Sequence, residues 1–426
     1  MSSKTKTTAT KEDAKSVLVP KLRFPAFRGA KGWVQETIGE ICKSFSGGTP
    51  STTQKDYYGG NIPFIRSAEI GRTETELFLT DVGLKNSAAK LVEKGDVLIA
   101  LYGANSGDVA LGKIDGAINQ AILCLQSESS NAFIYQFLSH RQQWIISTYL
   151  QGGQGNLSGD IVKSISLGFP TRAEQQKIAE CLSSVDEVIA AQARKLSALR
   201  THKNGLMQQL FPREGETEPR LRFPEFRGKG EWEMATIGDI FETSAGGTPE
   251  RSKMEYWNGS IPWVTTSLVD FNVISCAEEF ITNEGLKNSS AKMFPKNTVL
   301  VALIGQGRTR GKAALLDFEA STNQNCAGIL PTATVIPNFT FLNLCGRYEE
   351  MRALSNTAGQ GSLSQGLIRT LPFCFPKDKT EQHRIADCLS TLDNLIAAES
   401  QKLENLKTHK RGLMQQLFPS PEEVEA

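Results

Sequence analysis

Side-chain amides and guanidinium groups recur near glycines at matching places in the two halves of this 426-residue chain. Such groups can form bidentate hydrogen bonds with base edges, and glycines allow a loop to enter a groove. The pattern indicates recognition by hydrogen bonding. The candidate contact residues are Arg66, Ser67, Tyr102, Asn105, Ser106, Asn119, Gln120 and Gln154 in the first half, and Thr265, Thr266, Gln306, Arg308, Arg310, Asn323, Gln324 and Gln360 in the second.

Two interpretations of Asn119-Gln120 and Asn323-Gln324 are open, and the identity of these pairs in both halves favours the structural one. They either contact bases or stabilise their own turns through side-chain hydrogen bonds to the backbone. The candidates that differ between the halves are better suited to specificity, since two readers of different targets need different side chains.

The chain lacks complete motifs for catalysis. Gly107 to Lys113 has the spacing of a phosphate-binding loop, but Ile114 replaces the hydroxyl residue that would bind Mg²⁺, so a hairpin turn is favoured. The glycines after Gly305 do not fit a dinucleotide fingerprint. No nucleophile–base pair can be assembled from repeated positions. We therefore expect no catalytic, cofactor-binding or metal-binding residues in this chain.

The charge balance limits the possible partners. The chain has 47 Lys and Arg against 46 Asp and Glu, a net charge of +1. This excludes a disordered polyelectrolyte and a uniformly basic nucleic-acid coat protein, so any nucleic-acid surface is local or completed by a partner. There is no stretch long and apolar enough to span a bilayer and no C-x-x-C pair. A cytoplasmic location is expected.

An internal duplication determines the organisation of the chain. The segment Pro20 to Gly29 recurs as Pro219 to Gly228, and the motif G-G-T-P recurs 199 positions later. The closing segments, Thr201 to Pro212 and Thr408 to Pro419, agree at eleven of twelve positions, while the middles diverge. Two copies of one scaffold with different variable surfaces are therefore predicted. The similar closing segments also suggest two copies of one partner.

Each copy is predicted to end in a long helix. Apolar residues step by four and three from Ile178 to Leu210 and again from Ile385 to Leu417, which is the a/d seam of a coiled coil. If a pseudo-twofold axis relates the copies, the helices run antiparallel. The seam is polar at equivalent places, Gln192/Glu399 and Lys203/Lys410. Gly205 and Gly412 lie within the helical pattern, beside the seam residues Leu206 and Leu413, which indicates either a bend or the close approach of another backbone.

Short apolar runs bounded by glycines predict compact mixed α/β domains before the helices. The predicted boundaries are a flexible tail over 1–19, a first domain over 20–170, a helix over 171–212, a linker over 213–218, a second domain over 219–378, a helix over 379–419 and a tail over 420–426.

Four duplicated motifs together resemble the specificity (S) subunits of type I restriction-modification systems over essentially the full chain. They are L-R-F-P-x-F from Leu22 and Leu221, the opening T-I-G-[DE]-I followed by G-G-T-P, the Asn-Gln pair, and E-Q-x-x-I-A at the helix starts. The resemblance implies two target recognition domains, each reading one half of a bipartite, asymmetric DNA sequence, with the repeated helices paired as an antiparallel spacer.

The resemblance also implies the partners. These are double-stranded DNA, two modification (methyltransferase) subunits that methylate adenine with S-adenosylmethionine, and restriction subunits that use ATP and Mg²⁺ for translocation and cleavage. None of those cofactors is expected in this chain.

Two other interpretations of the function remain: a duplicated coiled-coil adaptor that binds protein or glycan ligands, and a cryptic enzyme.

Overall fold

The structure is a computed structural model that describes residues 18–149, 156–213, 215–305, 308–357 and 363–419. Contacts divide the chain into two units. Unit 1 contains the described residues of 1–193 and 402–426, and unit 2 contains those of 194–401. The two longest helices, α5 (Arg172–Leu210) and α11 (Lys379–Leu417), each contribute a segment to both units. Of the predicted tails, 1–17 and 420–426 lie outside the described residues.

Unit 1 contains two four-stranded sheets, with strand orders β2-β9-β6-β7 and β4-β3-β8-β5, and the pair β1-β10. Its strands are β1 (Val34–Thr37), β2 (Cys42–Ser46), β3 (Tyr58–Ile65), β4 (Leu77–Leu79), β5 (Lys90–Val92), β6 (Val97–Ala100), β7 (Val109–Leu111), β8 (Gly116–Ile118), β9 (Ile122–Ser127) and β10 (Ser166–Phe169). Its shorter helices are α1 (Ile38–Ile41), α2 (Asp81–Lys85), α3 (Asn131–Tyr149) and α4 (Gly159–Ser164).

Unit 2 repeats this topology with one additional edge strand, in the orders β12-β20-β17-β18-β14, β15-β13-β19-β16 and β11-β21. Its strands are β11 (Glu233–Thr236), β12 (Thr243–Ala245), β13 (Trp257–Val264), β14 (Asn272–Ile274), β15 (Glu279–Ile281), β16 (Met293–Phe294), β17 (Val299–Ala302), β18 (Ala313–Leu316), β19 (Ala320–Thr322), β20 (Cys326–Ile329) and β21 (Pro372–Phe375). Its helices are α6 (Ile237–Ile240), α7 (Asn283–Lys287), α8 (Pro337–Gly346), α9 (Tyr348–Thr357) and α10 (Gln365–Arg369).

The additional strand explains where the two sequences diverge most. In unit 2 the segment after β13 forms β14, which pairs in parallel with β18. In unit 1 the corresponding segment after β3 forms a loop that returns as β4. The same scaffold therefore carries a differently built edge in each unit.

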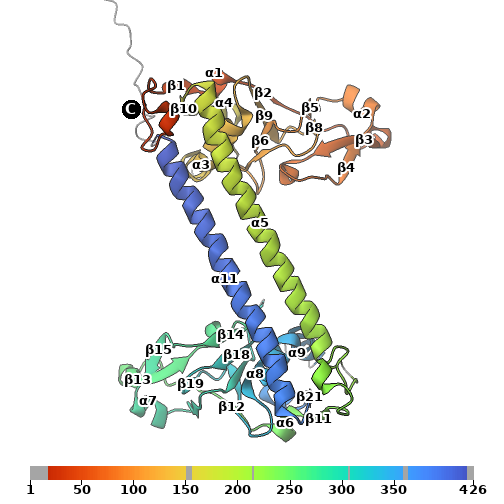
Figure 1. Cartoon of the computed structure of the whole chain (residues 1–426), viewed down its shortest axis with the longest axis vertical. Coiled ribbons are helices and arrows are strands. Elements are labelled where there is room, and N and C mark those ends of the chain that lie inside the picture. Colours follow the sequence, from red (N-terminus) through yellow and green to blue (C-terminus); the bar gives the residue numbers. More distant parts are fainter. Residues whose placement is uncertain (1–17, 150–155, 214, 306–307, 358–362, 420–426) are drawn as a thin grey trace, which may run out of the picture. The chain divides into compact units, whose positions relative to one another are not determined.

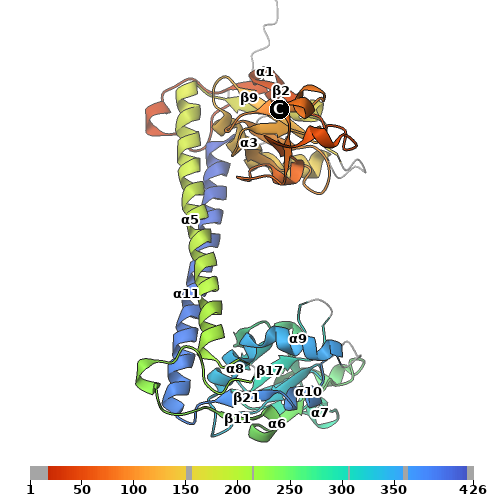
Figure 2. The same ribbon diagram turned by 90° about the vertical axis from the view of Figure 1, so that its right-hand side faces the viewer.

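Segments of α5 and α11 lie side by side and run in opposite directions within each unit (Figures 1 and 2). In unit 2 the Lys203 ammonium donates to Asp393 at 2.5 Å, and Lys195 pairs with Glu399. In unit 1 the equivalent lysine, Lys410, donates to Asp186 at 2.8 Å. The polar seam lysines thus bind carboxylates of the opposite helix. Antiparallel pairing and a mixed α/β duplication are confirmed.

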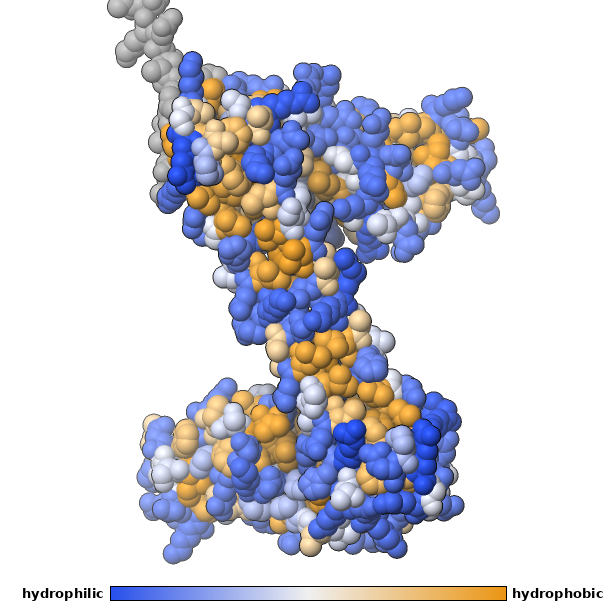
Figure 3. Space-filling model, in the orientation of Figure 1, coloured by the Kyte–Doolittle hydropathy of each residue, from blue (hydrophilic) through white to orange (hydrophobic). Residues whose placement is uncertain are grey.

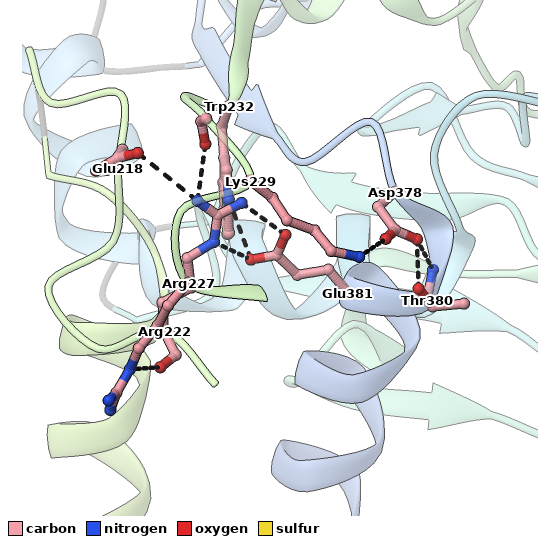
Figure 4. Close-up of polar contacts among 9 residues, drawn as sticks. Glu218, Arg222, Arg227, Lys229, Trp232, Asp378, Thr380 and Glu381 are labelled. Carbon is pink, nitrogen blue, oxygen red and sulfur yellow. Dashed lines mark hydrogen bonds and ion pairs between the residues drawn. The ribbon is translucent and has the colours of Figure 1, made fainter. Parts of the chain in front are cut away.

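A nearly buried ion pair ties the start of each α/β segment to a helix. Arg222 donates from Nε and Nη2 to both oxygens of Glu381, at 2.7 and 2.9 Å, and the indole nitrogen of Trp232 donates to the same carboxylate at 3.3 Å (Figure 4). The equivalent pair in unit 1 is Arg23 with Glu174, both distances being 2.7 Å. The duplicated L-R-F-P and E-Q motifs therefore form one structural contact.

The closing segments of the helices are similar partly because they enter hydrophobic cores. Leu210 and Phe211, at the end of α5, pack in the core of unit 2, and Leu417 and Phe418 pack in the core of unit 1. Equivalent backbone hydrogen bonds also hold the two helix ends. The Leu22 amide donates to the carbonyl of Gln416 at 2.9 Å, and the Leu221 amide donates to that of Gln209 at the same distance. This similarity therefore has a structural cause beside any partner surface.

The two seam glycines lie inside continuous helices. Apart from its two chain neighbours and the backbone of its own helix within four residues, a methyl group placed on Gly205 or Gly412 would meet no described atom within 4 Å. Of the two alternatives, a bend or the close approach of another backbone, the close approach is therefore not found among the described residues. No helix in the part of the chain that the structure describes is long and apolar enough to cross a membrane. The predicted domain boundaries stay a prediction.

Candidate nucleic-acid interface

Parallel strand pairs bring the divergent candidates next to the shared ones. In unit 1, β3 and β8 are parallel neighbours, with Ile65 opposite Ile118. Arg66 and Ser67 follow β3 directly, and Asn119 and Gln120 follow β8 directly. Because the carboxyl ends of parallel strands meet at one edge of a sheet, these four residues lie together.

Unit 2 builds the same edge with other side chains. Its parallel strands β13 and β19 align Val264 with Thr322. Thr265 and Thr266 follow the first strand, and Asn323-Gln324 follow the second. The Thr266 hydroxyl donates to the side-chain oxygen of Asn323 at 2.9 Å, which joins the divergent and shared residues directly.

A hairpin loop joins this edge from the second sheet of each unit. The amide of Leu101, after β6, donates to the carbonyl of Ala121 at 2.8 Å, and Leu303 donates to Asn325 at the same distance. The hairpin of unit 1 presents Tyr102, whose side chain is 40% exposed. The hairpin of unit 2 carries Arg308 and Arg310. Three loops therefore converge in each unit.

Two hairpin candidates also stabilise the loop itself. The Ser106 hydroxyl donates to the carbonyl of Leu101 at 2.8 Å and accepts from the amide of Leu157 at 3.3 Å. Asn105 donates to Asp108 at 3.0 Å. These contacts support Tyr102, the neighbouring exposed residue.

In unit 2, Arg308 is exposed, and its backbone carbonyl accepts a hydrogen bond from the Tyr348 hydroxyl at 2.7 Å. Arg310 is half-buried. The candidates Gln154, Gln306 and Gln360 lie outside the described residues.

Arg66 is tied to two carboxylates. Its guanidinium donates to Glu69 at 3.1 and 3.0 Å and to Glu76 at 2.5 Å. Burial opposes ionisation of Glu69, but hydrogen bonds from Arg66 and from the backbone of Glu76 outweigh it and lower the Glu69 pKa to about 2. Hydrogen bonding to Glu69, then to Glu76, raises the pKa of Arg66. Arg66 therefore cannot offer its full fork to a base without breaking an ion pair.

Glu69 fixes the loop of unit 1 that follows β3. Its side chain is 2% exposed and accepts from the backbone amides of Arg66 at 3.0 Å and Glu76 at 3.1 Å. The Thr75 hydroxyl donates to it at 3.2 Å. One buried carboxylate thus holds both ends of the segment in which the two units diverge.

The asparagines of the shared pairs stabilise their own turns. The Asn119 side-chain oxygen accepts from the amide of Ala121 at 3.2 Å, and that of Asn323 accepts from the amide of Asn325 at 3.1 Å. These are the bonds that the structural interpretation of the pairs predicts. The glutamines differ, because both are exposed and bond to another loop.

The other loop is the duplicated G-G-T-P segment, whose threonine sequence reasoning missed. The Thr49 hydroxyl donates to the side-chain oxygen of Gln120, and that of Thr248 donates to Gln324, at 2.5 Å in both units. The available signal was that G-G-T-P and Asn-Gln are both duplicated. Glu69 and Tyr348 were also missed, and neither belongs to a repeated motif.

Among the described residues, no group of three or more His, Cys, Asp or Glu side chains is arranged to hold a metal ion. Burial raises the pKa of the Cys326 thiol, which lies behind the unit 2 edge, to about 12. This thiol therefore stays protonated at neutral pH. The groups at the edge are hydrogen-bond donors and acceptors.

Comparison with family models gives one match in each half of the chain. Residues 30–201 and 229–408 both match the type I restriction modification DNA specificity domain. These two stretches cover most of the chain and correspond to its duplication.

Relatives and solved structures agree with this match. The chain is 29% identical over 318 residues to the type I restriction enzyme MjaIX specificity subunit of Methanocaldococcus jannaschii, covering 70% of this chain and 72% of the relative. It is 24% identical over 335 residues to the EcoR124I/EcoR124II specificity subunit of Escherichia coli, covering 72% and 76%. A type I S subunit from M. genitalium has the same fold, with a TM-score of 0.60 at 16% identity, over 95% of this chain and all of that one.

Proposed function

This chain belongs to the type I restriction-modification DNA specificity family, and from that premise we propose that each unit reads one half of a bipartite, asymmetric DNA sequence. The observation that carries the proposal is the edge found in both units. Strand order, parallel pairing and the Thr–Gln contact are repeated, whereas the side chains beside them differ. A repeated frame with different contact residues is what two readers of different half-sites require.

We assign specificity mainly to the divergent residues of each edge. In unit 2 these are Thr265, Thr266, Arg308 and Arg310, and Arg308 is the exposed guanidinium best placed to contact a base edge. In unit 1 they include Ser67 and Tyr102, with Asn105 and Ser106 supporting the hairpin. Arg66 acts mainly through the loop that it and Glu69 hold.

The catalytic steps are assigned to partners. MjaIX and EcoR124I/EcoR124II relatives are named specificity subunits, and this chain is likewise proposed to be non-catalytic. S-adenosylmethionine, ATP and Mg²⁺ would then be bound by two modification subunits and by restriction subunits. With a net charge of +1, the chain alone has little charge to neutralise phosphates, so the partners would supply much of the DNA affinity. Because its proposed target is DNA in the cell, we place this chain in the cytoplasm.

The paired helices offer a surface for such partners. Apolar patches are visible on them in Figure 3. Val188 of α5 and Leu395 of α11 occupy equivalent positions and are 51% and 40% exposed, respectively. Exposed apolar residues on a helix suit contact with another protein. The adaptor alternative, with protein or glycan ligands, has no support from the comparisons.

The experiment is to express the chain with its modification partner in a host and to map methylated adenines with and without this gene. The proposal predicts a gene-dependent motif made of two short defined parts with a gap between them. Methylation that is unchanged by loss of the gene, or that follows a single continuous motif, would contradict it.

A further inference from the structure

We infer that Gln120 and Gln324 contact the DNA phosphate backbone, one in each half-site, and that Thr49 and Thr248 are the positioning residues that hold them. This inference rests on the proposed DNA recognition and adds a division of labour within each edge. The glutamines would place the duplex in the same way on both units, and the divergent neighbours would read its sequence.

The G-G-T-P loop reaches the glutamine because its glycines permit a very close approach. A β-carbon on Gly47 would lie 1.8 Å from the carbonyl oxygen of Ile118, and one on Gly246 would lie 2.2 Å from that of Thr322. These are the last residues of β8 and β19, directly before the Asn-Gln pairs. Any side chain at these two glycines would push the loop away from the turn.

The Thr–Gln contact leaves the donor end of each amide available. The threonine hydroxyl donates to the glutamine oxygen in both units. Among the described residues, no hydrogen bond occupies either amide nitrogen, and both glutamines are exposed. A side-chain amide held at its oxygen offers two N–H donors, so its natural partner is a hydrogen-bond acceptor such as a phosphate oxygen.

The duplication argues for phosphate over a base. The two units differ at the residues beside the glutamines, Arg66-Ser67 and Thr265-Thr266, yet keep the glutamine, the threonine and their bond. A side chain that reads sequence should change when the half-site changes. The sugar-phosphate backbone is the part of DNA that both half-sites share, and contacts to it set register without reading sequence.

A lysine at equivalent positions of the two units also favours a phosphate contact. Lys90 lies over the Phe45 ring, 5.5 Å from its centre, and the equivalent Lys292 donates to the Ser244 hydroxyl at 3.1 Å. Phe45 and Ser244 are equivalent residues of the strands that lead into the two G-G-T-P loops. Both lysines are exposed. Each unit therefore carries a positive charge beside the strand leading to its Thr–Gln contact.

The test uses the complex of the full chain with its modification partner and two DNA duplexes. One duplex carries the motif found by methylation mapping, and the other is unrelated in sequence. Gln120→Glu keeps an acceptor for Thr49 but removes both donors and adds a negative charge. Gln143→Glu adds the same charge in unit 1 at an exposed position of a different element, α3, and serves as the matched control.

We expect Gln120→Glu to weaken binding about tenfold or more on both duplexes, because a hydrogen bond to a charged group is lost, while Gln143→Glu stays near wild type. Gln324→Glu should behave like Gln120→Glu. Thr49→Val should weaken both duplexes and Thr49→Ser should restore them. Lys90→Ala should weaken both and lower the slope of log affinity against log salt by about one.

Three results would overturn the inference. Loss confined to the motif duplex would make Gln120 a base reader. Wild-type binding by Gln120→Glu, with unfolding of Thr49→Val at a lower temperature, would make the contact purely structural. An equal loss in Gln143→Glu would leave only a general charge effect. Failure of the proposed function is a different result, since the wild-type complex would then show no preference for either duplex.

Discussion

Removing Arg222 should destabilise unit 2 far more than removing a neighbouring arginine. Arg222→Met leaves the Glu381 carboxylate, whose side chain is 1% exposed, without the bonds at 2.7 and 2.9 Å. Among the described residues, the Trp232 N–H at 3.3 Å is then its remaining side-chain donor. Leaving one partner of a buried ion pair alone costs about 3–5 kcal/mol. Hydrogen-exchange protection of unit 2 amides should therefore fall about a hundredfold or more.

The chain supplies a matched control for this variant. Arg227 is exposed in the same segment, and its side chain makes a single hydrogen bond of 3.4 Å to the carbonyl of Arg222. Arg227→Met should change the free energy of opening by less than about 0.5 kcal/mol. Arg222→Met combined with Glu381→Met should recover most of the loss, because no buried charge is then left unpaired.

Hydrogen exchange measured by mass spectrometry compares the protection of unit 2 amides in these variants and in the wild type. Unit 1 peptides, held by the equivalent Arg23 and Glu174, serve as the internal reference. If Arg222→Met and Arg227→Met lose protection equally, or if the double variant is no better than Arg222→Met, the ion pair does not hold the segment and the reasoning fails.

Glu69→Gln should loosen the loop after β3 and weaken discrimination between correct and altered sequences at the first half-site alone. Glu74→Gln, an exposed change in the same loop, should have neither effect. Methylation of DNA sites substituted in one half-site measures the discrimination of both variants. The stabilisation by Glu69 should be complete above its ordinary pKa of 4.5 and be lost as pH falls towards about 2; acid unfolding of wild type and Glu69→Gln should converge there. Arg308→Ala should cost about 1–3 kcal/mol on the second half-site if it contacts a base; equal loss on unrelated DNA would indicate a phosphate contact. Gly205→Ala and Gly412→Ala should each stabilise the isolated chain by about 1 kcal/mol, because a methyl group meets nothing there; urea unfolding would show destabilisation if the space were needed.

Features that repeat in sequence could be predicted from sequence. The duplication located both α/β scaffolds, and the four-and-three spacing identified the helix seam, in which Leu182, Leu196, Leu389 and Leu403 are buried. The polar residues that the sequence placed in the seam are also buried, since Gln192 and Glu399 are only 7% and 9% exposed. Periodicity and self-similarity are local or pairwise signals, so they survive without knowledge of the fold.

Contacts between distant segments could not be predicted in the same way. Pairing of β3 with β8 brings Ile65 beside Ile118, and nothing in either strand specifies the other. Arg66 illustrates the consequence: its residue type suggested a base contact, but Glu69 and Glu76 hold its guanidinium. The role of Thr49 likewise depends on the distance to Gln120, which only the folded loops define.

The most direct test of the account is to exchange the second reader alone. Residues 219–378 of this chain are replaced by the equivalent domain of a relative, and the methylated adenines of the host are mapped in the presence of the modification partner. The account predicts that one half of the bipartite motif changes and that the other half is retained. Changes in both halves, or an unchanged motif with full activity, would contradict independent reading by the two units.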